Sequence, residues 1–201
     1  MFISRSKLAP ILLFLACAAC SSVTEPSPLV GTTEATLTSA TGNGVVIHAN
    51  GAGVVDLSSA GAADADFQFV AKRKADGTVL GHFRQSRMRG TLLVEFEGSV
   101  TCVTTDPAFP GRARIGGVIT ANNSTDPAFL TINHEVGDDA WFRVQDGEDA
   151  ESAVDVSTTI GFKPVLVNTS AEYCALPFDG LPWWNPASLF PLKHGTIGVK
   201  Q

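Results

Sequence analysis

The fold is decided by a stretch that begins Asp66-Phe67-Gln68-Phe69-Val70-Ala71-Lys72-Arg73-Lys74 and continues, after Ala75-Asp76-Gly77-Thr78, with Val79-Leu80-Gly81-His82-Phe83-Arg84-Gln85. Large apolar residues stand two positions apart at Phe67 and Phe69, and the period continues through Val79 and Phe83. This is the period of a strand that buries one face. Asp76-Gly77 supplies the turn, because glycine adopts positive φ at little cost. We therefore predict an antiparallel hairpin here.

The same alternation continues downstream. In residues 92–102 one face is apolar and consists of Leu92, Val94, Phe96, Val100 and Cys102. The opposite face carries Glu95, Glu97 and Thr101. Residues 113–120 form a fourth segment of this kind, so the block from Asp66 to Thr120 is predicted to hold four consecutive antiparallel strands, each with one solvated face.

The rest of the chain indicates short strands joined by turns. We expect strands over residues 35–39, 44–48, 140–145, 154–160 and 194–200, and a loop or weak edge strand over the small residues 51–63. The total of about eight to ten strands with short connections is typical of an all-β fold. We predict an antiparallel meander that forms a closed or nearly closed barrel, because closure removes exposed edges. A β-sandwich is the alternative.

The N-terminus has the pattern of a secretory signal. Arg5 and Lys7 precede an apolar run over residues 8–19, which ends in small residues and is short for a bilayer span. We assign residues 1–19 to a signal peptide, residues 20–33 to a lipidated N-terminus with a flexible tether, and residues 34–201 to a single β-domain.

The end of the apolar run resembles the lipobox of bacterial lipoproteins, where small residues precede a cysteine that becomes lipidated. Cys20 follows Ala18-Ala19 and is our predicted site; Cys17 is the alternative, and a plain cleaved signal peptide is a further one. Acyl chains such as palmitate bury in lipid at roughly 0.8 kcal/mol per methylene, so several chains would anchor the protein stably. By resemblance to sorting rules in double-membrane bacteria, Ser21 favours the outer membrane.

Charge limits the partners. The chain has 14 basic and 20 acidic residues, and the predicted signal peptide takes two of the basic ones. The remainder therefore carries a formal charge of −8. This overall balance disfavours nucleic acid, and also an anionic membrane surface, as a partner. The membrane contact that we predict is made through the lipid anchor.

Two cysteines remain after the signal region is set aside, Cys102 and Cys174. An exported protein meets oxidising conditions, where an even pair usually forms a bridge. We therefore predict a structural disulfide. The alternative, a metal or redox site, lacks a second cysteine or histidine at ligand spacing.

An acidic run follows the segment over residues 140–145. Asp146, Glu148 and Asp149 flank Gly147, and hard oxygens on a glycine-turned loop suit Ca²⁺. The spacing does not match an EF-hand, so we interpret the run as a solvated turn and keep calcium as a weak alternative. No other metal site is predicted.

Charged residues on the strand block admit two interpretations. Glu95 and Glu97 stand about 7 Å apart by strand geometry, and paired carboxylates serve glycoside hydrolysis. A solvated strand face explains them better. Cross-strand pairing with these glutamates also explains a set of basic residues that we expect on the same outer face, for which an anion or polysaccharide site is the alternative: Lys72, Lys74, Arg84, Arg87, Arg112 and Arg114.

The most distinctive stretch is residues 177–191, which combines four prolines with four aromatic residues. The prolines exclude regular structure, yet exposed aromatic side chains are unfavourable in water. We expect a loop that folds over a barrel end or a sheet face. The alternative is a lid or a carbohydrate- or lipid-contacting patch built on Trp183 and Trp184.

Several short patterns occur in a fixed order, and they are Phe67-x-Phe69-x-Ala71-x-Arg73, Gly98-x-Val100-Thr101-Cys102, Ile115-Gly116-Gly117-Val118-Ile119-Thr120, Tyr173-Cys174 and His194-Gly195-x-Ile197-x-Val199. In these the chain resembles a group of uncharacterised exported β-domains and lipoproteins of environmental bacteria, over about residues 66–201. The resemblance implies an all-β domain with Cys102 and Cys174 paired. It implies no activity, and the chain departs from the pattern at residues 145–149 and in its Trp-rich stretch.

These observations favour an envelope-anchored lipoprotein whose β-domain has a non-catalytic structural or interaction role. We expect no enzymatic activity and no cofactor, since there is no G-x-S-x-G nucleophile motif and no cluster of metal ligands at a recognised spacing. The alternative is a barrel that binds a small hydrophobic ligand or a carbohydrate under a Trp-rich lid.

Overall fold

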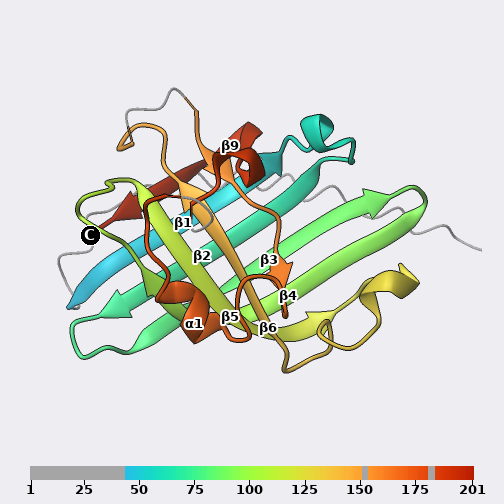
Figure 1. Cartoon of the computed structure of the whole chain (residues 1–201), viewed down its shortest axis with the longest axis horizontal. Helices are drawn as coiled ribbons and strands as arrows, with labels where there is room; N and C mark the ends of the chain where they lie inside the picture. Colours follow the sequence, from blue (N-terminus) through green and yellow to red (C-terminus); the bar gives the residue numbers. More distant parts are fainter. Residues whose placement is uncertain (1–43, 151–153, 181–183) are drawn as a thin grey trace, which may run out of the picture. The chain divides into compact units, whose positions relative to one another are not determined.

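The computed structural model describes residues 44–150, 154–180 and 184–201, and this part of the chain is a single antiparallel sheet with short connections (Figure 1). Its strands are β1 (Val45–Val55), β2 (Ala65–Lys74), β3 (Val79–Arg89), β4 (Leu92–Thr104), β5 (Arg112–Asn122), β6 (Asp139–Gln145), β7 (Val156–Ser157), β8 (Gly161–Phe162) and β9 (Phe190–Lys200). The helical elements are α1 (Ser170–Cys174) and the 3₁₀ turns η1 (Ser58–Ala60), η2 (Pro127–Phe129) and η3 (Pro186–Ser188).

The predicted all-β class and the barrel are confirmed. Hydrogen-bonded neighbours follow the order β5-β4-β3-β2-β1-β9-β7-β6, and a pairing of β5 with β6 closes a ring of eight strands. In the part of the chain that the structure describes, β8 pairs with β6 and with no other strand. The ring is not even around an axis, because β7 contributes two residues where its neighbours contribute seven and eleven. Among the described residues, no helix is long and apolar enough to cross a membrane.

The signal peptide, the tether and the expected strand over residues 35–39 lie outside the described residues, as do Cys17 and Cys20. The predicted hairpin is present as β2 and β3, and the backbone N–H of Thr78 donates to the carboxylate of Asp76 across the turn (2.9 Å).

The prediction of a loop or edge strand over residues 51–63 was wrong for residues 51–55. β1 continues to Val55 and pairs with β2 on one side and β9 on the other. The small residues are required by packing rather than by a turn. A Cβ at Gly51 would lie 2.7 Å from the ring of Phe69, so the strand needs glycine there.

The strand expected over residues 154–160 is also shorter than predicted. β7 comprises Val156 and Ser157, and residues 158–160 form a non-strand connection to β8. Thr158 still hydrogen-bonds Arg143 of β6 through its backbone N–H (3.0 Å), and the backbone N–H of Ile160 donates to the side-chain oxygen of Gln85 (2.9 Å).

Cys102 does not share the apolar face of β4 as its alternation predicts. The register between β4 and β5 shifts between Val100 and Cys102, which marks a β-bulge. Val100 and Val103 are therefore the buried residues on either side of the bulge, and Cys102 is half-buried and faces α1, to which its disulfide connects it. One extra residue in the strand changes which face every later side chain occupies.

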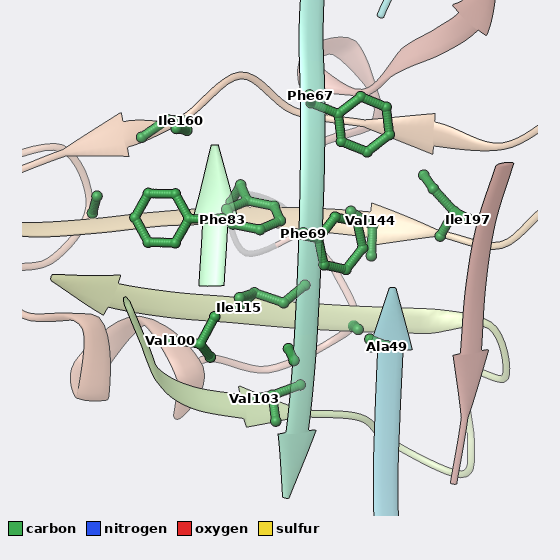
Figure 2. Close-up of a cluster of buried hydrophobic side chains, with 14 of the residues drawn as sticks. Ala49, Phe67, Phe69, Phe83, Val100, Val103, Ile115, Val144, Ile160 and Ile197 are labelled. Atoms are coloured by element: carbon green, nitrogen blue, oxygen red, sulfur yellow. The ribbon is translucent and has the colours of Figure 1, made fainter. Parts of the chain in front are cut away.

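The interior of the barrel is filled by its own side chains (Figure 2). Phenylalanine rings meet across it: the centroid of Phe142 lies 5.2 Å from that of Phe69 and 5.8 Å from that of Phe83, both in edge-to-face geometry. Aliphatic residues from β4, β5, β6 and β9 complete the core, including Val100, Ile115, Val144 and Ile197.

Two glycines within β4 and β5 make room for this core. A Cβ at Gly98 would lie 2.1 Å from the ring of Phe83, and one at Gly117 would lie 2.9 Å from it. The Phe83 ring thus lies flat over β4 and β5, and a larger residue at either glycine would displace it.

Candidate functional site: the C-terminal strap over β5 and β6

A segment that we call the strap, described over residues 169–180 and 184–189, crosses the outer face of β5 and β6 with α1 at its start (Figure 1). Thr169 caps α1 by accepting the backbone N–H of Glu172 (3.1 Å). The backbone N–H of Ser170 donates to Asp139 at the beginning of β6 (2.8 Å). These contacts fix the start of the strap on the sheet.

The disulfide between Cys102 and Cys174 is present and joins α1 to β4, as predicted. The two Cα atoms lie 6.3 Å apart. Gly116 of β5 lies against the bridge and the start of α1, since a Cβ there would lie 2.7 Å from both the Cys102 sulfur and the Ser170 Cβ. The glycine therefore allows the bridge and the helix to approach the sheet, which is the physical basis for an Ile-Gly-Gly sequence in β5.

Trp184 is the aromatic anchor of the strap. Its side chain is buried and stacks on Phe178, with ring centroids 5.5 Å apart. Three guanidinium groups surround its indole: that of Arg112 lies 4.8 Å from the ring centroid, and those of Arg114 and Arg143 each lie 5.4 Å from it. Trp183, the other predicted contact residue, lies outside the described residues.

The arginines come from alternate positions of β5 and β6 and bind the backbone of the strap. Arg112 donates to the carbonyl of Phe178 (3.1 Å), and Arg114 donates to that of Pro177 (2.6 Å). Arg143 donates to the carbonyl of Asn185 (2.8 Å) and to the hydroxyl of Ser188. Charge-assisted hydrogen bonds of this kind are about twice as strong as neutral ones.

Burial changes the pKa values of the arginines and of Tyr173 between the strap and the sheet. It lowers the pKa of the Arg112 and Arg114 guanidinium groups. It also raises the pKa of Tyr173, and this effect outweighs the opposing influence of Arg143 and Arg114 next to its hydroxyl. Among the described residues, neither Arg112 nor Arg143 forms an ion pair with a carboxylate. Their charges are instead met by aromatic faces and carbonyl oxygens.

The predicted gathering of basic residues on one outer face is only partly correct. Arg84 lies between both glutamates, 2.5 Å from Glu95 and 3.6 Å from Glu97. Arg112 and Arg114 lie under the strap, where they donate to its carbonyl groups and not to these glutamates. Glu95 and Glu97 thus both pair with Arg84.

Two residues of the strap site were not singled out by the sequence. Tyr173 stacks on Trp141 of β6, with centroids 5.6 Å apart, and Arg143 lies two positions along the same strand face. The signal was available in the outward-facing positions of residues 139–145, which alternate Asp, Trp, Arg and Gln and contain two large side chains that need a partner.

The acidic run lies where β6, the short strand β7 and β9 meet, a junction that we call the seam of the barrel. Asp146 is buried and accepts the backbone N–H of Val199 in β9 (3.2 Å) and that of Glu148 in its own turn (3.0 Å). Asp155 accepts the N–H groups of Ile197 (2.7 Å) and Gly147 (2.7 Å). The two carboxylates thus bind an edge of β9 that the two-residue β7 does not reach. In the described residues no group of three potential ligands could hold a metal ion.

We predict that Asp146→Asn destabilises the protein by about 1–3 kcal/mol at pH 7, because the new amide N–H₂ faces backbone donors. Burial raises the pKa of Asp146 above its ordinary 3.8. Between 3.8 and the raised value the native state binds more protons than the unfolded state, so this residue's contribution to stability falls as pH rises through that window. The difference in stability between the wild type and the Asp146→Asn variant, measured by urea unfolding, should therefore be larger at pH 4 than at pH 7.

The exposed Asp149→Asn is the matched control, and we expect it to change stability by less than about 0.5 kcal/mol at either pH. An equal effect of both substitutions would show that the carboxylate of Asp146 does not hold β9.

Two small pockets border the core in the described part of the chain. One, of about 30 Å³, is lined by Phe96, Phe129, Ile160 and Phe162 among others, and a second, of about 10 Å³, lies beside Phe83 and Phe142. Sites for drug-sized ligands have volumes of roughly 300–1,000 Å³. Neither pocket has room for such a ligand in this conformation.

Comparisons with protein-family models, with curated proteins and with solved structures give no match to this chain.

Proposed function

We propose that this protein is an envelope-anchored bacterial lipoprotein, tethered through Cys20 to the outer membrane, whose β-domain has a non-catalytic structural or interaction role. The observation that carries the proposal is the N-terminal pattern of a basic start, an apolar run and Ala18-Ala19-Cys20. The disulfide supports it, because such bridges form in exported proteins and are rare in the cytosol.

The packing supports a role for the outer surface. The interior is filled by the core side chains, and Trp184 is used in packing the strap against β5 and β6. Exposed apolar side chains occur on the outer surface, for example in the connection between β5 and β6, where Leu130, Ile132 and Val136 are 54%, 77% and 67% exposed. Clustered exposed apolar residues are typical of contact surfaces.

We predict that Cys20→Ala abolishes lipid attachment, whereas Cys17→Ala retains it. Each full-length variant would be expressed in a double-membrane bacterium with an alkyne-tagged fatty acid, and incorporation of the tag would be measured together with detergent-phase partitioning. Loss of the tag in Cys17→Ala but not in Cys20→Ala would move the anchor to Cys17. Absence of the tag from the wild-type protein would overturn the proposal.

A further inference from the structure

A basic patch lies at one end of the barrel, where the described chain begins. His48 of β1 pairs with Lys72 of β2 on one side and with Lys200 of β9 on the other, so three basic side chains form a row across the outer face. Lys74, the last residue of β2, pairs with Val45 at the start of β1. Figure 1 shows the start of β1, the turn between β2 and β3 and the C-terminus at this end of the sheet.

The lysines carry the positive charge of this row. Burial together with Lys72 and Lys200 lowers the pKa of His48, which favours the uncharged imidazole between the two lysines. In the described residues the salt bridges involve Arg84, Arg89 and Lys193, and none involves Lys72, Lys74 or Lys200. The acidic residue in the adjoining turn is Asp76, whose carboxylate accepts the N–H of Thr78 and feels Lys74 only through space.

Apolar side chains flank the row. Val46 is 44% exposed and Leu80 is 49% exposed, and Leu80 is the cross-strand neighbour of Lys72. Lysines with apolar neighbours are suited to a lipid headgroup region, because their stems contact apolar surface while the ammonium groups remain with the phosphates.

The position of the patch indicates its partner. Residues 1–43 join the described domain at Gly44, two residues before Val46, so the lipid-anchored segment enters the domain beside the patch. We infer that the face formed by His48, Lys72, Lys74 and Lys200 docks on the anionic surface of the membrane to which the protein is anchored. The net negative charge of the whole chain disfavours long-range attraction to such a surface, but screening at physiological salt weakens charges beyond about 8 Å, so the local patch decides the contact once the anchor holds the domain near the membrane.

The inference rests on the proposed lipid anchor, and one experiment separates the two. Lipidated full-chain protein extracted from membranes would be reconstituted into phosphatidylcholine vesicles with or without about 30% phosphatidylglycerol, an anionic lipid that attracts basic residues. Flotation of the vesicles reports the anchor. A water-soluble acetylating reagent and peptide mass spectrometry then report the accessibility of each lysine. The matched controls are Lys163 and Lys193, which lie away from the patch.

We expect Lys72 and Lys200 to be acetylated at least about threefold more slowly on anionic vesicles, because each basic residue near such a surface strengthens attraction roughly fivefold. Lys163 and Lys193 should react equally on both, and about 0.5 M salt should remove the protection. The double substitution Lys72→Gln/Lys200→Gln should also abolish the protection of Lys74, whereas Lys163→Gln should not.

Each other outcome overturns the inference. If the protein floats but Lys72 and Lys200 react equally on both vesicles, the anchor stands and the docking face is wrong. If inorganic phosphate on neutral vesicles gives the same protection, the patch binds soluble anions rather than a membrane. If the protein does not float, the anchor and the docking face both fall.

Discussion

Replacement of both Cys102 and Cys174 by alanine is expected to lower the free energy of unfolding by about 4 kcal/mol, because the bridge closes a loop of 72 residues. In the chain-entropy treatment the bridge acts mainly by restricting the unfolded chain. The strap should then depend on its non-covalent contacts, among them Trp184 with the arginines and the start of α1 on β6. Equilibrium unfolding in urea, followed by tryptophan fluorescence, measures the change.

Two controls test whether the loss of stability comes from the disulfide itself. Wild-type protein treated with a reductant should unfold at the same urea concentration as the double variant, and each single alanine substitution should match it. A loss below about 1 kcal/mol would show that the unfolded chain retains the contact between α1 and β4, so that closing the loop restricts little. It would not alter the assignment of the bridge itself.

The local part of the fold was predictable from the sequence. The hairpin of β2 and β3 follows from alternation on either side of Asp76-Gly77, since both strands and their turn are encoded within a short local stretch. β4 and β5 follow in the same way. Closure of the barrel was predicted only as a class, because the pairing of β1 with β9 joins segments about 150 residues apart and no local pattern encodes it.

The errors share one physical cause, which is that a strand's faces depend on its partners. The bulge that turns Cys102 outward is specified by pairing with β5, and alternation along β4 alone cannot reveal it. Likewise, the glycine-rich end of β1 resembled a loop because its need for small residues comes from Phe69 in the next strand. Apolar patterns in the sequence predict which residues are buried, but they do not predict which neighbouring strand buries them.

The candidate site was predicted in its parts but not as a unit. The sequence predicts the disulfide and a loop over a sheet face, and the bridge and the burial of Phe178 and Trp184 agree with this. The arginine layer was not, since Arg112, Arg114 and Arg143 come from two strands and meet Trp184 only after the strap has crossed them. The sequence allows Asp146 to be a calcium ligand. Its role as an acceptor for Val199 of β9 becomes visible only once the barrel is closed.

Trp184→Ala is expected to destabilise the protein by about 3–5 kcal/mol, the range for truncating a buried aromatic side chain. The substitution removes the stacking partner of Phe178 and the aromatic face that three guanidinium groups share. Those charges would then face a cavity or water, and burial already disfavours the charged form of two of them. Urea unfolding followed by circular dichroism measures the loss without depending on the removed fluorophore.

Trp184→Phe separates ring stacking from simple volume. It keeps an aromatic face for the arginines, so we expect it to lose only about 1–2 kcal/mol, consistent with the weaker attraction of a cation to phenylalanine than to tryptophan. If Trp184→Phe is as damaging as Trp184→Ala, shape rather than the aromatic face holds the strap. If Trp184→Ala costs less than about 1 kcal/mol, Trp184 is not the anchor.

Combining Trp184→Ala with removal of the disulfide tests whether both act on one element. Cys174 and Trp184 hold the strap at two points, one through sulfur to β4 and the other through the arginines of β5 and β6. If the strap detaches once either point is lost, the combined loss will be smaller than the sum of the separate losses by more than about 0.5 kcal/mol. Additive losses would mean that the two points are independent, and the strap would then be two separately docked segments.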